Sequence, residues 1–260
     1  MTKSVFPFFT VLLGSLILYT SCSNNDNDTT TTTDNDVAKT PVSAFDEFNK
    51  DAVTISFDGD EITIETNGMP NHTSPYWEET APLYIAPVVA IAQTPGRIGD
   101  RNLTVTIPAA PEIAASSTAT GLGPIGISVT GVPIFNDTEG PNRPIEEQIV
   151  ETFDYAGAHN GPSGYHYHIE SYDVPENTVL SHNDEKLVGI MADGFLIYGR
   201  KCNSLGDHPT NLDVSGGHIS STQHSDGEEF YHYHIINEFY LGSIIALFAG
   251  DLQGTPNSIM

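Results

Sequence analysis

The chain has 260 residues, of which 34 are acidic and 9 basic, so that its formal net charge is −25 with histidines neutral. So negative a protein is a poor partner for nucleic acids and anionic membrane surfaces and a good one for cations, although acidity also simply keeps secreted proteins soluble. Its 2 cysteines exclude a disulfide framework.

The N-terminal segment has the features of a targeting signal. Lys3 precedes the apolar run Val5–Tyr19, which is short for a membrane span, and small residues come directly before Cys22. We expect a signal peptide over residues 1–21. The segment resembles a bacterial lipoprotein box, which implies a lipid on Cys22 and attachment to a membrane outside the cytoplasm. The expected location is the cell envelope, in the outer membrane or facing the periplasm, with surface exposure left open; plain secretion is the alternative.

The next stretch predicts a linker. Ser23–Asp36 (SNNDNDTTTTTDND) has no apolar residue, so it cannot bury enough surface to offset the entropy of ordering. We therefore expect a disordered acidic linker over residues 22–45. Residues 46–260 are then one domain, which is long enough for a substantial core.

Alternating apolar and polar residues predict short strands through most of this domain. Ala52–Phe57 and Glu61–Glu65 flank the turn Asp58–Asp60, as in a hairpin. Further strands are expected at Asn102–Pro108, Ile125–Val129, Leu187–Met191 and Phe195–Tyr198.

Helical patterns are scarce. Arg143–Phe153 has an apolar stripe at helical spacing, and Tyr240–Ala249 is either a core strand or a short helix. The 17 prolines and 23 glycines disfavour long helices elsewhere. The expected fold is mainly β, a sandwich or barrel-like single domain with at most one or two short helices.

The chain also contains an internal duplication. Three blocks recur in the same order and at similar offsets: Ile125–Phe135 with Val188–Tyr198, Phe153–His159 with Leu212–His218, and Tyr165–Ile169 with Tyr231–Ile235. The small differences between the offsets indicate loop-length changes. We predict repeat units over about residues 124–170 and 187–236, related by a pseudo-twofold axis within the domain.

The last block contains Tyr-His-Tyr-His in each copy. On a strand, residues two apart share a face, so His166 and His168 should lie side by side, with Tyr165 and Tyr167 on the reverse face. The same holds for the second copy: Tyr231, His232, Tyr233 and His234. Paired imidazoles of this kind commonly hold a metal ion.

Each copy has a further histidine upstream. His159 and His218 follow glycines that allow tight turns, and Asp154 and Asp213 come five residues earlier, as oxygen ligands or as acceptors that orient the imidazoles. Three imidazoles and a carboxylate suit copper, zinc, iron or manganese better than calcium or magnesium. Cys202, without an intrachain partner, is either a ligand or a buried thiol.

These motifs resemble the YHYH-domain family, whose members include secreted bacterial proteins. The resemblance runs from about Val53 to Gly250, and besides the two tetrapeptides it includes Asn67–His72, Gly131–Asn136 and Ala192–Gly199. It adds His72 to the candidate ligands but implies no activity. Leu196 stands where the family usually has proline. Tyr155–His159 stands where the family tends to have a Cys-Gly-Gly-His-like segment, which puts a thiolate ligand in the first copy in doubt.

Two functions fit these patterns. The first is an envelope protein that binds a transition metal, either as a metal-binding protein or as a redox or hydrolytic metalloenzyme, with Asp193 or Asp154 as a base. The second is an extracellular binding, adhesion or structural module whose histidines and tyrosines form a hydrogen-bonded core without metal. The candidate ligands are His72, His159, His166, His168, His218, His232 and His234. The expected supporting residues are Asp154, Asp193, Asp213, Tyr165, Tyr167, Tyr231 and Tyr233.

Overall fold

The computed structural model of the protein describes residues 39–177, 180 and 182–260. The predicted signal peptide, Cys22 and most of the predicted linker lie outside the described residues. The described residues all fall within one compact unit, Val37–Met260. None of the helices in this described part is long and apolar enough to cross a membrane.

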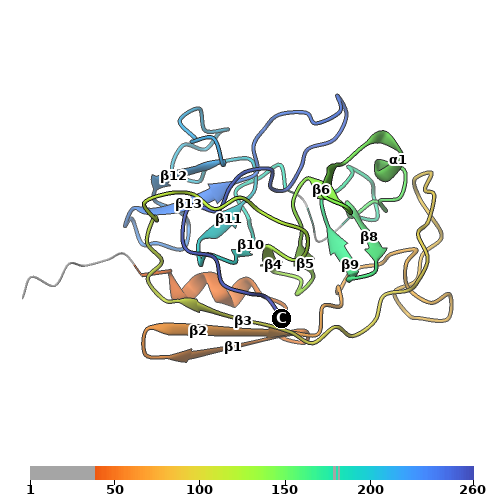
Figure 1. The fold of residues 1–260 in the computed structure, drawn as a ribbon, viewed down its shortest axis with the longest axis horizontal. Coiled ribbons are helices and arrows are strands. Elements are labelled where there is room, and N and C mark those ends of the chain that lie inside the picture. Colours follow the sequence, from red (N-terminus) through yellow and green to blue (C-terminus); the bar gives the residue numbers. More distant parts are fainter. Residues whose placement is uncertain (1–38, 178–179, 181) are drawn as a thin grey trace, which may run out of the picture. The chain divides into compact units, whose positions relative to one another are not determined.

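The protein is mainly β, as predicted, with two short helices in the described residues (Figure 1). The strands are β1 (Val53–Asp58), β2 (Glu61–Thr66), β3 (Leu103–Pro108), β4 (Gly126–Ser128), β5 (Pro133–Ile134), β6 (Thr138–Glu139), β7 (Arg143–Pro144), β8 (Ala158–Gly161), β9 (Gly164–Tyr167), β10 (Leu187–Met191), β11 (Leu196–Tyr198), β12 (Gly217–Ser220) and β13 (Phe230–His234). The helices are the 3-10 helix η1 (Val42–Glu47) and α1 (Glu147–Val150).

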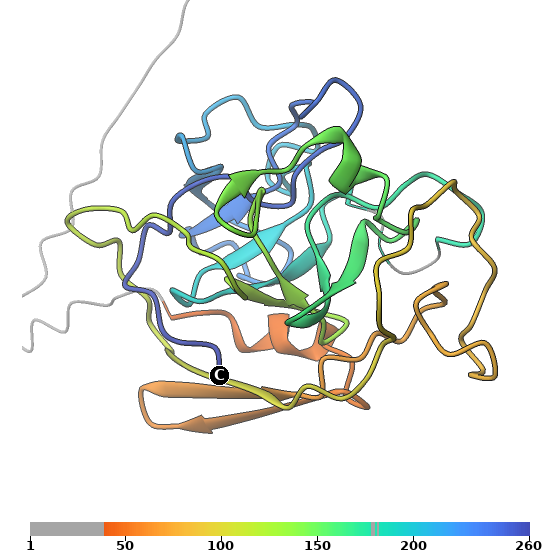
Figure 2. The same cartoon turned by 45° about the vertical axis from the view of Figure 1, so that its right-hand side comes forward.

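Strands β1, β2 and β3 form a small antiparallel sheet. The predicted hairpin is present, and its alternation places Ile62 and Ile64 of β2 on the buried side. These isoleucines pack with Phe45 of η1 and with Ile127 and Ile190 of the large sheet. Figures 1 and 2 show η1 between the two sheets. The arrangement is therefore sandwich-like, with an apolar core between two layers.

The large sheet shows the predicted duplication directly. Its strand order is β12-β13-β11-β10-β4-β5-β9-β8, in which each strand of one repeat has its counterpart at the mirrored position. The repeats meet where β4 and β10 pair antiparallel, with Ile127 opposite Ile190. These two residues occupy equivalent positions in the first aligned block. The pseudo-twofold axis therefore passes between Ile127 and Ile190.

The two faces of the large sheet carry different side chains. Tyr165 and Tyr167 of β9 and Tyr231 and Tyr233 of β13 belong to one apolar cluster. The alternate residues of β13 lie on the other face, where Phe230 joins the core beneath the small sheet. The strand histidines share that face because residues two apart point the same way.

Two segments differ from the helical expectation. The apolar stripe over Arg143–Phe153 yields only the four-residue α1, because β7 occupies its start and Ile145 and Phe153 are buried in a cluster with Ile169 and Ile244. Tyr240–Ala249 is neither a helix nor a regular strand and forms only isolated bridges, such as Ala246 with Ile169.

The folded part also begins earlier than the predicted linker boundary. Helix η1 starts at Val42, and Ala44 and Phe45 are buried at 0% and 6% exposure. The segment without apolar residues, Ser23–Asp36, ends before Val42, so the apolar residues near position 45 can join the core.

Candidate metal centres

The first repeat gathers four ligand-type side chains, which we call the Glu-His centre: Glu139, His159, His166 and His168. Their ligand atoms all lie within 4.8 Å of one another. Glu139 Oε1 is 3.0 Å from Nε2 of both His159 and His168. Nε2 of His159 is 3.1 Å from Nε2 of His166. Strands β6, β8 and β9 supply the first three side chains, and His168 follows β9 directly.

The second repeat gathers an equivalent group, which we call the Cys-His centre: Cys202, His218, His232 and His234. Cys202 Sγ is 3.6 Å from His218 Nε2, and the Nε2 atoms of His232 and His234 are 3.2 Å apart. All four residues are buried, whereas the side chain of Glu139 in the first centre is 25% exposed. Cys202 is a free cysteine.

The strand histidines of the first copy are held by backbone carbonyls. His166 Nδ1 lies 2.7 Å from Gly164 O, and His168 Nδ1 lies 2.6 Å from Asn136 O. A carbonyl oxygen only accepts hydrogen bonds, so Nδ1 must donate in both contacts. We therefore assign the proton of each neutral imidazole to Nδ1.

The second copy repeats these contacts at equivalent positions. His232 Nδ1 donates to Phe230 O at 3.0 Å, and His234 Nδ1 donates to Gly199 O at 2.7 Å. Gly199 is the counterpart of Asn136, since each directly follows its copy of the first aligned block. The duplication has thus preserved the supports of the imidazoles as well as the imidazoles themselves.

The upstream histidines are held by side-chain oxygens. His159 Nδ1 is 2.6 Å from Thr152 Oγ1, whose hydroxyl hydrogen is used in a bond to Ile149 O, so the threonine accepts from the imidazole. His218 Nδ1 is 3.1 Å from Asn211 Oδ1. Each of the six imidazoles therefore has Nδ1 occupied and Nε2 facing its centre.

This tautomer pattern favours a cation at each centre. A neutral imidazole with its proton on Nδ1 presents a lone pair at Nε2, and lone pairs facing each other at 3.1 or 3.2 Å repel. In addition, Glu139 Oε1 and His168 Nε2 are buried without a hydrogen-bond partner. Buried polar atoms are normally satisfied, and a shared metal ion would satisfy both.

The spacing also fits a metal ion. A tetrahedral zinc with Zn–N bonds of about 2.1 Å and a Zn–S bond of about 2.3 Å keeps its ligand atoms roughly 3.4–3.6 Å apart. The closest pairs in both centres, at 3.0 to 3.6 Å, are near this range. Both centres could therefore hold a metal ion.

Burial favours the neutral imidazole at His232, His234 and His166, and metal binding requires that form. Loss of solvation lowers the pKa of His232 to about 4, and loss of solvation together with the charge of His232 lowers the pKa of His234 to about 3. The pKa of His166 is held well below its ordinary value in the same way.

The thiol of Cys202 is biased toward the thiolate. Burial would raise its pKa, but hydrogen bonds from Ser204 and Ser220 and the neighbouring His218 lower it below the ordinary value. A thiolate is the form of cysteine that binds metals.

Two glycines bring the upstream histidines onto the strand pairs, as their position before His159 and His218 suggests. Gly157 has φ +77° and its counterpart Gly216 has φ +84°, a backbone region that favours glycine. A Cβ at Gly157 would clash with the backbone carbonyl of Ile169, whose carbon would lie only 2.9 Å away. The turn therefore approaches the end of β9 more closely than a side chain would permit.

Several predicted residues lie outside both centres. His72 is buried on the tyrosine face, where its Nε2 is 2.7 Å from Tyr167 Oη and its Nδ1 2.7 Å from Thr73 O. It is therefore not grouped with the ligands, contrary to our expectation, because strand alternation points Tyr167 away from His166 and His168.

The predicted aspartates also lie on the tyrosine face. Asp154 accepts hydrogen bonds from Tyr165 and Ser74, and Asp213 accepts one from Tyr231 at 2.7 Å. They therefore orient tyrosines, and neither lies in the groups of ligand-type side chains that contain the imidazoles. Burial raises the pKa of Asp154 to about 6 despite these hydrogen bonds.

Asp193 occupies the same kind of environment. It is 1% exposed and accepts hydrogen bonds from Tyr233 Oη at 2.7 Å and from the Gly254 amide at 3.0 Å. Since its carboxylate is buried among these donors and outside both centres, it does not fit the role of a base at a metal ion.

Glu139 was not among the predicted ligands, and Cys202 was predicted to be either a ligand or a buried thiol. The two residues are separated by the same offset that relates Ile125–Phe135 to Val188–Tyr198. The alignment could therefore have revealed both, because a glutamate and a cysteine at equivalent positions are both metal-ligand types.

The two centres share no residue and lie in opposite halves of the large sheet. Strands β9 and β13 are five strand steps apart in that sheet, which corresponds to roughly 24 Å at about 4.8 Å per step. The duplicated motifs thus form two separate groups of ligand-type side chains and do not converge on one.

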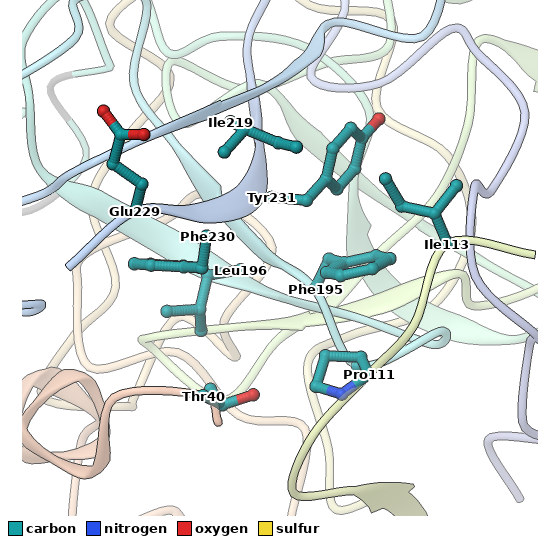
Figure 3. Close-up of a pocket in the computed structure, with 10 residues that line it drawn as sticks. Thr40, Pro111, Ile113, Phe195, Leu196, Ile219, Glu229, Phe230 and Tyr231 are labelled. Atoms are coloured by element: carbon teal, nitrogen blue, oxygen red, sulfur yellow. The ribbon is translucent and has the colours of Figure 1, made fainter. Parts of the chain in front are cut away.

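The centres differ in the size of the pockets that they line, since His234 of the Cys-His centre lines a pocket of only about 140 Å³. Glu139, His159 and His166 line a pocket of about 830 Å³. A separate pocket of about 210 Å³ lies beside β11 and β13 and is lined by residues such as Phe195, Leu196 and Ile113 (Figure 3). That smaller pocket contains no residue of either centre.

Comparison with known proteins gives one match. Residues 104–215 match the family model described as "YHYH protein". This segment contains the first Tyr-His-Tyr-His motif and the Glu-His centre, and it ends before the second motif. Neither the curated proteins nor the solved structures contain a significant match. Over residues 104–215 the chain is therefore similar to the YHYH protein family, which agrees with the resemblance of its motifs.

Proposed function

We propose that the protein binds two transition-metal ions, one in the Glu-His centre and one in the Cys-His centre. The supporting observation is the orientation of six buried imidazoles, whose Nδ1 atoms are all occupied while their Nε2 atoms converge on a carboxylate or a thiol. A hydrogen-bonded core without metal would instead alternate donors and acceptors at the points of contact.

The ligand sets suit different ions. The Glu-His centre, with one hard oxygen and three imidazoles, suits zinc, iron, manganese or copper, and the thiolate of Cys202 makes the Cys-His centre softer and favours zinc or copper. All four residues of the Cys-His centre are buried, as in sites where the protein supplies every ligand and the metal stabilises the fold.

We assign the chemistry to the Glu-His centre. Three of its residues line the pocket of about 830 Å³, and Glu139 is 25% exposed. A metal ion there would act as a Lewis acid or redox centre for a molecule in the pocket. The protein would then be a metalloenzyme with one catalytic and one structural metal ion.

The first test is metal analysis of the purified protein. We expect about two metal ions per chain, about one in His166→Asn, about one in His232→Asn and none in the double variant. His208→Asn is the control, since His208 bonds Asn183 outside both centres and should retain both ions. A wild-type protein that stays metal-free after incubation with zinc, cobalt and copper would refute the proposal.

The second test separates the centres by their spectra. Cobalt bound to Cys202 should give a sulfur-to-metal charge-transfer band, which Cys202→Ser removes while the visible bands of cobalt in the Glu-His centre remain. His166→Asn should have the opposite effect. Charge-transfer intensity that survives Cys202→Ser would contradict the assignment.

We further propose that a lipid on Cys22 holds the protein at the cell envelope. The support is the apolar run Val5–Tyr19 followed by small residues and Cys22. Cys22→Ala should abolish labelling by a radioactive fatty acid and move the protein from the membrane fraction to the soluble fraction. A wild-type protein that is never labelled would favour plain secretion.

A further inference from the structure

The pocket beside the Glu-His centre has the size of a small-molecule site. Its volume is about 830 Å³, within the range of roughly 300–1,000 Å³ that is usual for ligand pockets. Glu139, His159 and His166 form part of its lining, so a molecule in the pocket would lie against a metal ion held there.

The rest of the lining carries no ionisable side chain. It combines apolar residues and glycines with small uncharged polar residues such as Thr94, Asn160 and Ser163. Leu122, Phe135 and Ile149 are the large aliphatic and aromatic side chains among them. The lining residues therefore offer dispersion contacts and no counter-charge of their own apart from the metal centre. The nearby guanidinium groups of Arg97 and Arg101 are exposed and donate to the carbonyl oxygens of Gly96 and Pro162, each at 3.0 Å.

The polar part of the wall is preformed. Thr94 Oγ1 donates to Asn160 O, and Asn160 Nδ2 donates to Pro95 O at 3.0 Å. These bonds fix the segment at Thr94 to the end of β8. The Phe135 ring lies nearly parallel to the His166 imidazole, with centroids 4.0 Å apart and an interplanar angle of 25°. The aromatic wall of the pocket therefore extends up to His166, a residue of the Glu-His centre.

The charge of the protein disfavours an anionic ligand. The chain carries a formal net charge of −25, and its summed field lowers the local concentration of anions. A cation in the pocket would lie against the metal ion and lack a counter-ion among the other lining residues. An uncharged molecule meets neither penalty.

We infer that this pocket binds an uncharged, mostly apolar small molecule that reaches the metal ion of the Glu-His centre with one nitrogen or oxygen donor. The inference rests on the proposed metal binding. The donor would enter as an added ligand, since a zinc-type site can expand to five ligands, and the apolar body would lie against Leu122, Phe135 and Ile149.

The test uses the cobalt-substituted protein and three probes. The probes are 4-phenylimidazole, imidazole, and 4-phenylimidazole with a carboxylate on the phenyl ring. Each is titrated while the visible bands of cobalt are recorded in the His232→Asn background, where cobalt is expected in the Glu-His centre alone. We expect 4-phenylimidazole to bind at least about tenfold more tightly than imidazole, because burying the phenyl ring adds apolar contact, and at least about tenfold more tightly than the carboxylate analogue.

Two rim variants test the location of the binding site. Leu122 is 54% exposed and Ser163 is also exposed, so Leu122→Trp and Ser163→Trp should fold normally and fill the pocket. Both should weaken 4-phenylimidazole at least about tenfold without loss of cobalt. Leu205→Trp is the matched control, since Leu205 is 57% exposed and outside the pocket lining, and it should change nothing.

The outcomes distinguish failure of the proposed metal binding from failure of the inference about the pocket. A protein that binds no cobalt refutes the proposed function before any probe is added. If cobalt binds but the three probes bind with equal affinity, or if both rim variants behave as Leu205→Trp does, the metal proposal stands and the inference about the pocket is overturned.

Discussion

Replacing His72 tests whether this histidine is a buried neutral partner of Tyr167 or a metal ligand. Loss of solvation lowers the pKa of His72 to about 4 in the folded protein, and its side chain is 5% exposed. In the unfolded chain the pKa of His72 is about 6.5, the ordinary value for histidine. Between these values the unfolded state binds a proton that the folded state does not, so stability must fall as the pH decreases below about 6.5.

The size of the effect follows from the two pKa values. With one pKa unit equal to about 1.36 kcal/mol, titration of His72 removes about 2 kcal/mol of stability between pH 7 and pH 5, and about 3 kcal/mol in total at pH values well below 4. His72→Gln has no such titration. When the pH is lowered from 7 to 5, we therefore expect the wild type to lose about 2 kcal/mol more stability than the variant loses.

The assay is urea unfolding of the metal-saturated wild type and of His72→Gln at pH 7, 6 and 5. Both proteins retain the two centres, so all other titrations cancel in the comparison, as does any constant offset caused by the substitution. Metal content should remain two per chain in the variant. If the free energies of unfolding of the wild type and the variant change equally with pH, His72 is not a buried neutral histidine. If the variant loses one metal ion, His72 is a ligand after all.

Three further predictions follow from the repeats and their supports. Glu139→Cys should give the first centre a thiolate, so the charge-transfer intensity of the cobalt protein should rise about twofold, and an unchanged spectrum would contradict the equivalence of the centres. Gly157→Ala should lower the free energy of unfolding in urea by more than about 2 kcal/mol, because the added Cβ would clash with Ile169 O and the residue has φ +77°. Gly59→Ala is the control: Gly59 has φ +62° but open space around it, so this variant should lose only about 1 kcal/mol. Asp193→Asn should reduce stability by about 1–3 kcal/mol, since the Asp193 carboxylate accepts bonds from a tyrosine and a backbone amide, yet elemental analysis should find both metal ions; loss of one would place Asp193 near a centre.

The fold could be predicted where the pattern is local. Alternation identified β1, β2 and β3, and the repeated blocks predicted a pseudo-twofold axis within the domain, which the structure places between Ile127 and Ile190. The stripe over Arg143–Phe153 misled because helical spacing also arises in irregular chain whose apolar residues reach a common core. Ile145 and Phe153 are buried with Ile169 and Ile244, which are distant in the sequence.

In the candidate site, too, local features could be predicted and contacts between distant residues could not. The residue spacing alone predicted that His166 and His168 share a face opposite the tyrosines, because side-chain direction on a strand depends only on the backbone of neighbouring residues. The groups that meet those imidazoles became apparent only in the folded chain. Glu139 meets His168, and Cys202 joins the group of His232, across long stretches of intervening chain. Contacts across a sheet depend on strand order and register, which local backbone geometry does not specify.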